Sequence, residues 1–298
     1  MNFYQNPPVY AEYTQKLFQL KNQYPWLKLF TIGKSVLGRR IYALGIGNLR
    51  SLNLFVGAVH AQEWLTTSLL VRFAEDVCQS IQQKTTFAGI AFDRVLLEKG
   101  MVLIPMLNSD GVEIALGGIK TAKQWQKKVK EMSKLDSRSW QANVRGVDLN
   151  HNFDAGFALC KQAEQEKGIT QPSPRQYGGK TPHSEPETKA LVHFCESFDV
   201  KCAFAFHSQG EEIYFAYGDR TPAVSKYIAS LLASYSGYAI KQPTGLASHG
   251  GFKDWFVEKQ GRPGFTIEIG RGENPLPIED LPAVYEKLRD AMAVMSVV

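Results

Sequence analysis

Apolar residues follow two alternating patterns along this chain, one typical of strands and the other of helices. Continuous apolar runs, which are typical of strands buried on both faces, occur at residues 53–59, 101–107, 202–206 and 264–269. Strand-like patterns also occur earlier, at residues 27–32 and 40–46. Helical spacing of apolar residues is found at residues 9–24, 64–82, 185–198, 223–235, 250–259 and 281–295. Strands that alternate with helices predict an α/β fold with a parallel or mixed sheet.

One long stretch is expected to be poor in helices. Residues 156–182 include Pro172, Pro174 and two adjacent glycines, and both residue types interrupt regular structure. Loops of this length in compact domains are usually functional or disordered. No repeat or low-complexity linker divides the 298 residues, so we expect a single domain spanning residues 1–298.

Charge and composition argue against two classes of partner. The formal net charge of +5 is a mild excess of 34 basic over 29 acidic residues. The basic run at residues 120–134 is interrupted by Glu131, so we expect a solvated helix face and no nucleic-acid partner. A membrane-spanning helix needs about 20 apolar residues, and no such run occurs, so we expect no membrane partner. Because the first residues lack the pattern of a signal peptide, we expect a cytoplasmic protein.

The four cysteines are expected to be small buried side chains in a reducing compartment. They are Cys78, Cys160, Cys195 and Cys202. None forms a Cys-x-x-Cys pair, and Cys78 and Cys195 fall within helical apolar patterns. Their spacing argues against a structural zinc site built from cysteines.

Polar residues near the ends of three apolar strands indicate metal-assisted hydrolysis. His60 and Glu63 directly follow the first buried strand, and a spacing of three residues on a helical turn places both side chains on one side. His207 ends another apolar strand, and Glu268 lies inside a third, where an unpaired carboxylate would be costly. Two imidazoles and a carboxylate are a usual ligand set for catalytic zinc, and Glu268 would supply a base.

Each of these signals alone also has an ordinary structural explanation. A His-x-x-Glu pair can belong to a capped helix start, and a lone histidine at a strand end is often hydrogen-bonded. A glutamate in a strand is often paired with a basic residue. The metal interpretation is favoured because one sheet would bring the ends of these strands together.

Six motifs in a fixed order resemble those of the M14 zinc carboxypeptidase family. They are His60-Ala-Gln-Glu63, Asn108-Ser-Asp-Gly111, Gly146-Val-Asp-Leu-Asn150, Ser184-Glu-Pro-Glu-Thr188, His207-Ser208 and Thr266-Ile-Glu268. Tyr177-Gly-Gly also resembles a segment of that family, and the likeness extends over residues 10–290. The resemblance implies one α/β domain with a central mixed sheet of eight strands, helices on both faces, and one zinc ion per chain.

The resemblance also implies the metal ligands and the base. His60, Glu63 and His207 would bind zinc, and Asp148 would orient His60 through its other ring nitrogen. Glu268 would activate the attacking water and pass its proton to the leaving amine.

Two further roles follow from the same resemblance. Asn150 would contact the carboxylate of the leaving residue. Arg145, just before the Gly-Val-Asp motif, would stabilise the negatively charged oxygen of the tetrahedral intermediate.

The sequence departs from the carboxypeptidases at His151. Carboxypeptidases of the family have an arginine there, which binds a terminal carboxylate with two parallel hydrogen bonds that a histidine cannot form. The segments Asn150–Phe157, Thr266–Pro277 and Ile32–Arg39 instead resemble the γ-D-glutamyl-meso-diaminopimelate peptidase I subgroup. Enzymes of that subgroup cut the bond between γ-D-glutamate and diaminopimelate in bacterial cell-wall peptides.

Three more residues are candidates for substrate binding. The stretch Gly245–Trp255 lacks the mobile tyrosine of the carboxypeptidases, and His249 is the side chain nearby that can give a comparable hydrogen bond. Lys253 stands where the family often has its selecting residue, and Arg271 follows Glu268. Positive charge at these positions suits the side-chain carboxylate of diaminopimelate, although ordinary surface solvation also explains it.

Three functions remain in competition. The first is a zinc peptidase that hydrolyses the γ-D-glutamyl to meso-diaminopimelate bond of cell-wall peptides with water activated by Glu268. The second is a conventional metallocarboxypeptidase with broader peptide substrates, to which His151 is the objection. The third is a non-catalytic binding domain on the same fold, and the intact ligand set argues against it.

Overall fold

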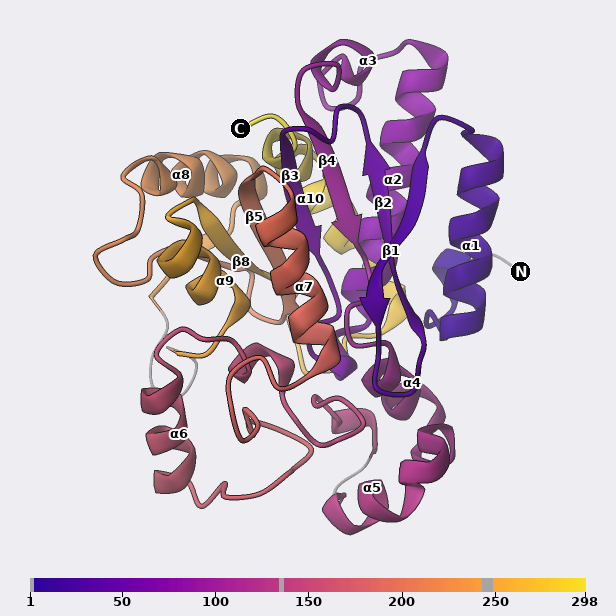
Figure 1. Cartoon of the computed structure of the whole chain (residues 1–298). Helices are drawn as coiled ribbons and strands as arrows, with labels where there is room; N and C mark the ends of the chain where they lie inside the picture. Colours follow the sequence, from indigo (N-terminus) through magenta and orange to yellow (C-terminus); the bar gives the residue numbers. More distant parts are fainter. Residues whose placement is uncertain (1–2, 134–136, 243–248) are drawn as a thin grey trace.

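A mixed eight-stranded sheet forms the centre of the molecule (Figure 1). The computed structural model describes residues 3–133, 137–242 and 249–298. The strand order is β1-β2-β4-β3-β5-β8-β6-β7. The strands are β1 (Lys28–Lys34), β2 (Arg40–Ile46), β3 (Leu52–Val56), β4 (Gly100–Ile104), β5 (Val200–Ser208), β6 (Glu212–Tyr214), β7 (Ala239–Ile240) and β8 (Gly264–Ile269). The predicted α/β fold with a mixed sheet of eight strands is confirmed.

The four middle strands β4, β3, β5 and β8 are parallel to one another. Every residue of β3 and β4 is buried, which explains their continuous apolar sequences. Parallel strands end at the same edge of a sheet, so the loops after β3, β5 and β8 meet there. In the register of β5 and β8, His207 lies opposite Glu268.

Helices cover both faces of the sheet (Figure 1). They are α1 (Tyr10–Gln23), α2 (Leu65–Gln83), α3 (Phe92–Val95), α4 (Ser109–Gly117), α5 (Gln126–Met132), α6 (Phe157–Glu166), α7 (Pro186–Ser197), α8 (Val224–Ser236), α9 (Phe252–Trp255) and α10 (Leu281–Met295). Successive residues of a strand point to opposite faces, so Phe55 of β3 joins the core under α2 and α10, whereas Leu54 and Val56 join the core under α7 and α9.

The structure corrects the expectation that residues 156–182 are poor in helices. Helix α6 occupies Phe157–Glu166. It buries only Cys160 and Glu164, so it lacks the apolar stripe by which a helix is usually predicted. Strands β6 and β7 have three and two residues, too few to show an alternating pattern.

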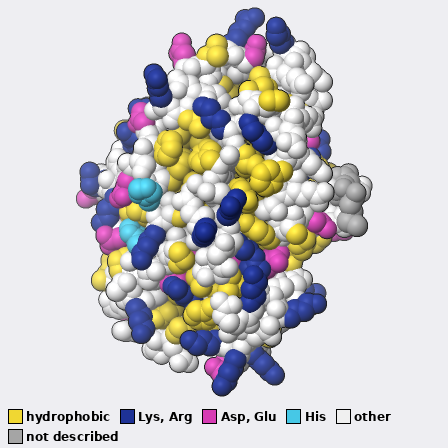
Figure 2. Space-filling model, turned by 45° about the vertical axis from the view of Figure 1, so that its right-hand side comes forward, with side chains coloured by type: hydrophobic (Ala, Val, Ile, Leu, Met, Phe, Trp, Pro, Cys, Tyr) yellow, Lys and Arg dark blue, Asp and Glu magenta, His cyan; other side chains and the backbone are white. Residues whose placement is uncertain are grey.

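The surface carries no single concentration of positive charge in the view of Figure 2. Lys and Arg side chains are spread over that face, with Asp and Glu between them. Among the described residues, no helix has the length and apolar character needed to span a bilayer. All four cysteines are buried and unpaired within the part of the chain described, as their sequence context predicts.

Candidate active site

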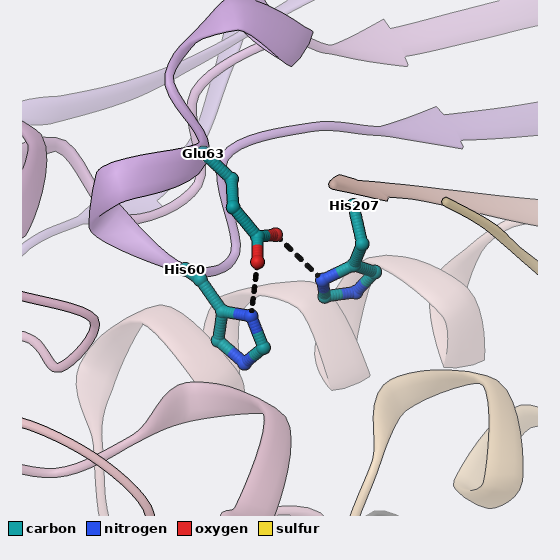
Figure 3. Close-up of side chains that lie close together, drawn as sticks. All are labelled: His60, Glu63 and His207. Carbon is teal, nitrogen blue, oxygen red and sulfur yellow. Dashed lines mark hydrogen bonds and ion pairs between the residues drawn. The ribbon is translucent and has the colours of Figure 1, made fainter. Parts of the chain in front are cut away.

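His60, Glu63 and His207 meet at the edge of the sheet where β3 and β5 end (Figure 3). His60 precedes the short 3₁₀ helix Ala61–Glu63, which carries Glu63, and His207 is the last residue but one of β5. Glu63 Oε1 lies 3.0 Å from His60 Nδ1, and Glu63 Oε2 lies 2.9 Å from His207 Nδ1. The two oxygen atoms of the Glu63 carboxylate therefore face the Nδ1 atoms of two different imidazoles.

Each charged group in this cluster shifts the pKa of its neighbours. Burial by itself would lower the pKa of His60, but the carboxylates of Glu63 and Asp148 hold it well above its ordinary value. Burial would raise the pKa of Glu63, but the imidazoles of His60 and His207 lower it to about 2. Glu63 is therefore ionised at neutral pH, which is the form that binds a metal ion.

The donor atoms of this cluster fit a zinc ion. One ligand atom from each of His60, Glu63 and His207 lies within 4.8 Å of the others. His207 and Glu63 are almost fully buried. Two imidazole nitrogens and one carboxylate are the donor set of many catalytic zinc sites, so these three residues would hold the metal.

Asp148 fixes the orientation of His60 from the other side of the ring. Its Oδ1 lies 3.1 Å from His60 Nε2 and accepts a hydrogen bond from the backbone N–H of Asn150 at 3.1 Å. Its Oδ2 accepts a hydrogen bond from the backbone N–H of Gln176 at 3.0 Å. A buried carboxylate held in this way keeps Nδ1 of His60 directed toward Glu63.

Glu268 lies on β8, beside His207 of the neighbouring strand. Burial raises the pKa of Glu268 well above its ordinary value, and the negative charges of Glu63 and Glu212 raise it further. Glu212 stands opposite Glu268 in the register of β6 and β8. A carboxylate with a raised pKa can take up and return a proton near neutral pH, which is what a general base must do.

Two cavities meet at Glu268 and Tyr214, which line both of them. The first, with a volume of about 240 Å³, is also lined by His60 and Lys253, and we call it the Lys253 cavity. The second, of about 440 Å³, is also lined by Glu63 and by Arg175, and we call it the Arg175 cavity. We call His60, Glu63 and His207 together the metal cluster. A substrate bound across these three side chains would place one part of its chain in each cavity.

Three of the predicted substrate-binding residues line the Lys253 cavity. Lys253 is 5% exposed, its Nζ donates to the backbone carbonyl of Ala216 at 2.9 Å, and it pairs with Asp254. Asn150 also lines this cavity, and its side-chain oxygen accepts from a backbone N–H at 3.0 Å. His151 completes the three, with Nδ1 lying 3.1 Å from a backbone carbonyl oxygen.

Arg145 lies away from the two cavities that Glu268 lines. Its guanidinium stacks over Trp125, 5.9 Å from the ring centroid, and lies 3.5 Å from Glu185. A positive φ of 73° at Gly146 turns the chain directly after it. Its predicted role at the oxyanion has no support from these contacts.

Arg271 and His249 also lie outside the residues that line the two cavities. Arg271 is exposed and pairs with Glu211 at 2.7 Å. His249 Nδ1 lies 3.1 Å from the hydroxyl oxygen of Tyr217. Residues 245–248, the part of the stretch where a mobile tyrosine would be sought, are outside the described residues.

The structure adds Tyr214, Gln141 and Arg175, which the sequence did not single out. Tyr214 is on β6, too short a strand to be predicted, and its hydroxyl donates to Glu212. Gln141 and Arg175 line the Arg175 cavity. The one sequence signal for Arg175 is its place two residues before the Tyr177-Gly-Gly segment.

His151, Cys160 and Glu164 form a second group of neighbouring side chains of the types that can bind a metal ion. Glu164 accepts a hydrogen bond from the backbone N–H of Gly178 at 2.8 Å and pairs with Lys161. The carboxylate of Glu164 thus holds the backbone at Gly178 against α6. These contacts account for the buried glutamate without a metal ion.

Comparison with known proteins agrees with this geometry. The model of the zinc carboxypeptidase family, M14 peptidases, matches residues 13–291. Gamma-D-glutamyl-L-diamino acid endopeptidase 1 of Lysinibacillus sphaericus is 32% identical over 280 residues, covering 93% of this chain and 69% of that protein. Carboxypeptidase A1 of Sus scrofa is 28% identical over 255 residues, covering 80% of this chain and 56% of that protein.

A solved structure has the same fold. The crystal structure of thrombin activatable fibrinolysis inhibitor superimposes with a TM-score of 0.78 at 20% identity, covering 98% of this chain and 76% of that one. The family match spans nearly the whole chain, and the residues that meet at the sheet edge are a zinc-binding set. The chain therefore belongs to the M14 family of zinc carboxypeptidases and is a zinc metallopeptidase with His60, Glu63 and His207 as its candidate metal site.

Proposed function

We propose that this peptidase hydrolyses the bond between γ-D-glutamate and a diamino acid, meso-diaminopimelate, in bacterial cell-wall peptides. The observation that carries the proposal is a buried lysine, Lys253, lining the cavity next to Glu268. The name of the Lysinibacillus sphaericus relative, an endopeptidase for γ-D-glutamyl-L-diamino acid bonds, supports the same substrate class.

The roles of the protein groups follow from their positions. A bound zinc ion supplies a Lewis acid that polarises the scissile carbonyl group. Glu268, at the junction of the two cavities, takes the proton of the attacking water and delivers it to the leaving amine. Asp148 keeps the His60 ring in place during the reaction.

Lys253 and Asp254 together suit the free end of diaminopimelate. That end carries a carboxylate and an ammonium group on one carbon atom, whereas lysine ends in an ammonium group alone. Lys253 and Asp254 form an ion pair, and both line the cavity. The lysine would bind the carboxylate and the aspartate the ammonium group, which is a charge match for diaminopimelate and a poor match for an apolar residue.

The second candidate is a conventional carboxypeptidase, which the similarity to carboxypeptidase A1 favours. His151 stands where such enzymes have an arginine, and its Nδ1 already faces a backbone carbonyl oxygen. An imidazole in this arrangement cannot form two parallel hydrogen bonds to a terminal carboxylate. A non-catalytic binding domain would need neither Glu268 nor an intact set of metal ligands.

The test compares two matched tripeptides, L-Ala-γ-D-Glu-meso-diaminopimelate and L-Ala-γ-D-Glu-L-Lys, incubated with the zinc protein and followed by mass spectrometry. We expect the diaminopimelate peptide to be cleaved with the higher kcat/KM. Lys253→Met should reduce this preference about ten- to a hundredfold, since a buried charge-assisted hydrogen bond is lost. Lys180→Met, which removes an exposed lysine, is the matched control.

Two results would contradict the proposal. Equal turnover of the two tripeptides by the unmodified protein would show that the diaminopimelate carboxylate is not recognised. Rapid release of C-terminal residues from ordinary α-linked peptides, with no cleavage of the γ-linked ones, would establish the conventional carboxypeptidase instead.

A further inference from the structure

Arg175 has unused hydrogen-bonding capacity beside the metal cluster. It lines the cavity that also contains Glu63 and Glu268. Its Nε donates to the side-chain oxygen of Gln141 at 3.1 Å. Among the described residues, no carboxylate forms an ion pair with it. A guanidinium has five N–H groups, so the terminal nitrogens of Arg175 remain available to an anion.

The backbone on both sides of Arg175 is held firmly to the site. The carbonyl oxygen of Pro174 accepts hydrogen bonds from the backbone N–H groups of Gln141 and Ala142, each at 3.0 Å. The backbone N–H of Gln176 donates to Asp148, the residue that orients His60. Gln141 is tied to the metal turn in the same way, because its carbonyl oxygen accepts from the N–H of Ala61 at 3.0 Å. Arg175 is therefore placed relative to the metal cluster by backbone hydrogen bonds.

The charge of Arg175 is unusual for its cavity. Of the described residues that line the Arg175 cavity, Arg175 alone is positively charged, and Glu63, Glu268 and Glu273 are acidic. Lys253 lines the other cavity, beyond the shared residues Tyr214 and Glu268. A substrate that spans the metal cluster thus meets one cation on each side of the scissile bond.

A γ-linked glutamyl residue offers an anion for the cation on the acyl side. Its amide bond uses the side-chain carboxyl group, so the α-carboxylate remains free and lies on the acyl side of the bond that is cut. An ordinary α-linked residue has no free carboxylate at that place. If the diamino acid occupies the Lys253 cavity, the glutamyl residue extends into the Arg175 cavity.

We propose that Arg175, held by Gln141, recognises the free α-carboxylate of the γ-linked glutamyl residue and so selects γ-linked over α-linked substrates. This inference rests on the proposed function. It makes Arg175 a specificity residue for the acyl side, complementary to Lys253 on the side of the leaving group. The planar guanidinium can bind a carboxylate with two parallel hydrogen bonds, which a lysine cannot do.

The experiment uses a pair of substrates that differ only in this carboxylate. The first is L-Ala-γ-D-Glu-meso-diaminopimelate, and the second has 4-aminobutyrate in place of D-glutamate. We expect the unmodified zinc protein to prefer the glutamyl substrate by about tenfold in kcat/KM, the lower end of the range for a charge-assisted contact because Arg175 is exposed to solvent. In Arg175→Met this preference should disappear, with the rate for the 4-aminobutyryl substrate unchanged.

Two variants complete the design. Arg175→Lys keeps the charge without the planar geometry and should retain part of the preference. Arg50→Met removes an exposed guanidinium before β3, at the opposite end of that strand from His60, and should leave both rates unchanged. Zinc content and the circular dichroism spectrum of each variant show whether the site and the fold are intact.

The outcomes separate this inference from the proposed function. If Arg175→Met slows both substrates equally, Arg175 stabilises the developing oxyanion and the specificity role is refuted. If the unmodified protein cleaves both substrates equally well, the α-carboxylate is not recognised. If it cleaves neither γ-linked substrate but releases residues from α-linked peptides, the proposed function itself fails.

Discussion

Two buried clusters each contain carboxylates, but the pKa of a glutamate is lowered in one cluster and raised in the other. The metal-site cluster consists of His60, Glu63, Asp148 and His207. The acidic cluster consists of Asp110, Asn143, Glu185 and Glu187. Glu63 is 3% exposed and Glu187 is fully buried, so burial does not distinguish them. The pKa of Glu63 is lowered to about 2, whereas that of Glu187 is raised to about 8.

The partners of each carboxylate explain the difference. Glu63 faces two imidazoles, whose positive charge outweighs the cost of burial. Glu187 is raised by burial and then by the negative charge of Asp110, and its partners, the backbone N–H of Val36 and the side chain of Asn143, are neutral. Burial therefore sets the cost of a charge, and the neighbouring groups decide whether the carboxyl group is ionised or protonated.

The acidic cluster holds a loop, and in the described structure no hydrogen bond or ion pair joins it to His60, Glu63 or His207. Asp110 accepts hydrogen bonds from the Ser35 hydroxyl at 2.8 Å and the Leu37 N–H at 2.7 Å, and it pairs with Arg39 at 2.6 Å. The motifs Asn108–Gly111, Ser184–Thr188 and Ile32–Arg39, which carried much of the family resemblance, thus fix one another. Motifs that look equally functional in the sequence therefore have different roles. Those of the metal-site cluster serve the chemistry, and those of the acidic cluster support the fold.

The largest effect that tests this division should come from Glu268→Gln. An amide cannot accept the proton of the attacking water, so kcat should fall by about 10²–10⁴-fold. Zinc content and the free energy of unfolding should stay unchanged, because Glu268 is not among the three candidate ligands. Kinetics with the γ-linked tripeptide, metal analysis and urea unfolding measure these quantities. Retention of more than about a tenth of the rate would assign the base to another residue.

The second prediction uses pH to test the acidic cluster. The folded-state pKa of Glu187, about 8, lies above the ordinary 4.5, so its contribution to stability is fully present below about pH 4.5 and is lost as the pH rises through about 8. Glu187→Gln is neutral throughout. Between about pH 5 and pH 9 the unmodified protein should lose stability relative to this variant, on the order of a few kcal/mol.

Urea unfolding of both proteins at the two pH values measures this difference. Glu286→Gln, which removes an exposed carboxylate of α10, is a matched control and should follow the unmodified protein. Parallel loss of stability in the unmodified protein and in Glu187→Gln would show that Glu187 is ionised in the folded state at neutral pH.

The third prediction concerns Arg39, which pairs with the fully buried Asp110. Arg39→Met leaves a buried carboxylate without its cation and should lower the free energy of unfolding by about 3 kcal/mol. Its kcat should be unchanged, because Arg39 does not line either cavity around Glu268. A fall in kcat at full zinc content would mean that the acidic cluster also positions the catalytic groups.

An element can be predicted from the sequence where its burial produces a recognisable pattern of apolar residues. Strands β3 and β4 are buried along their whole length and β5 and β8 along most of theirs, so their apolar runs identify them and place the residues at their ends. Helix α6 was missed because its buried side of Cys160 and Glu164 is not an apolar stripe. Pairing with neighbouring strands defines β6 and β7, and pairing is not a property of either segment alone.

The candidate site divides in the same way. His60, Glu63 and His207 were predictable because strand ends and family motifs coincide at them. The family resemblance gave Arg145 a role at the oxyanion, but its guanidinium lies over Trp125, away from the two cavities that Glu268 lines. Arg175 could not be predicted, because the hydrogen bonds that place it come from residues far away in the sequence.

The smallest of the predicted effects tests Asp148, the carboxylate of the metal-site cluster that is not one of the candidate metal ligands. Burial opposes its ionisation, but the His60 imidazole holds the pKa of Asp148 well below its ordinary value, so it is charged at neutral pH. Asp148→Asn keeps the shape of the side chain and removes the charge beside His60 Nε2. Zinc affinity should fall about ten- to a hundredfold, because His60 becomes a weaker and less well oriented ligand.

Competition with a chelator of known affinity measures the change in zinc affinity. Asn143→Asp is the reverse change, because it replaces an amide with a carboxylate. It lies in the acidic cluster, where the side-chain amide of Asn143 donates a hydrogen bond to Glu185 at 2.7 Å. It should lower stability while leaving zinc affinity unaltered, because it adds a buried negative charge among carboxylates. If Asp148→Asn lost only stability and Asn143→Asp lost zinc, the roles assigned to the two clusters would be reversed. Loss of zinc affinity in Asp148→Asn alone requires that the charge beside His60 acts on the metal ligand and not on the fold.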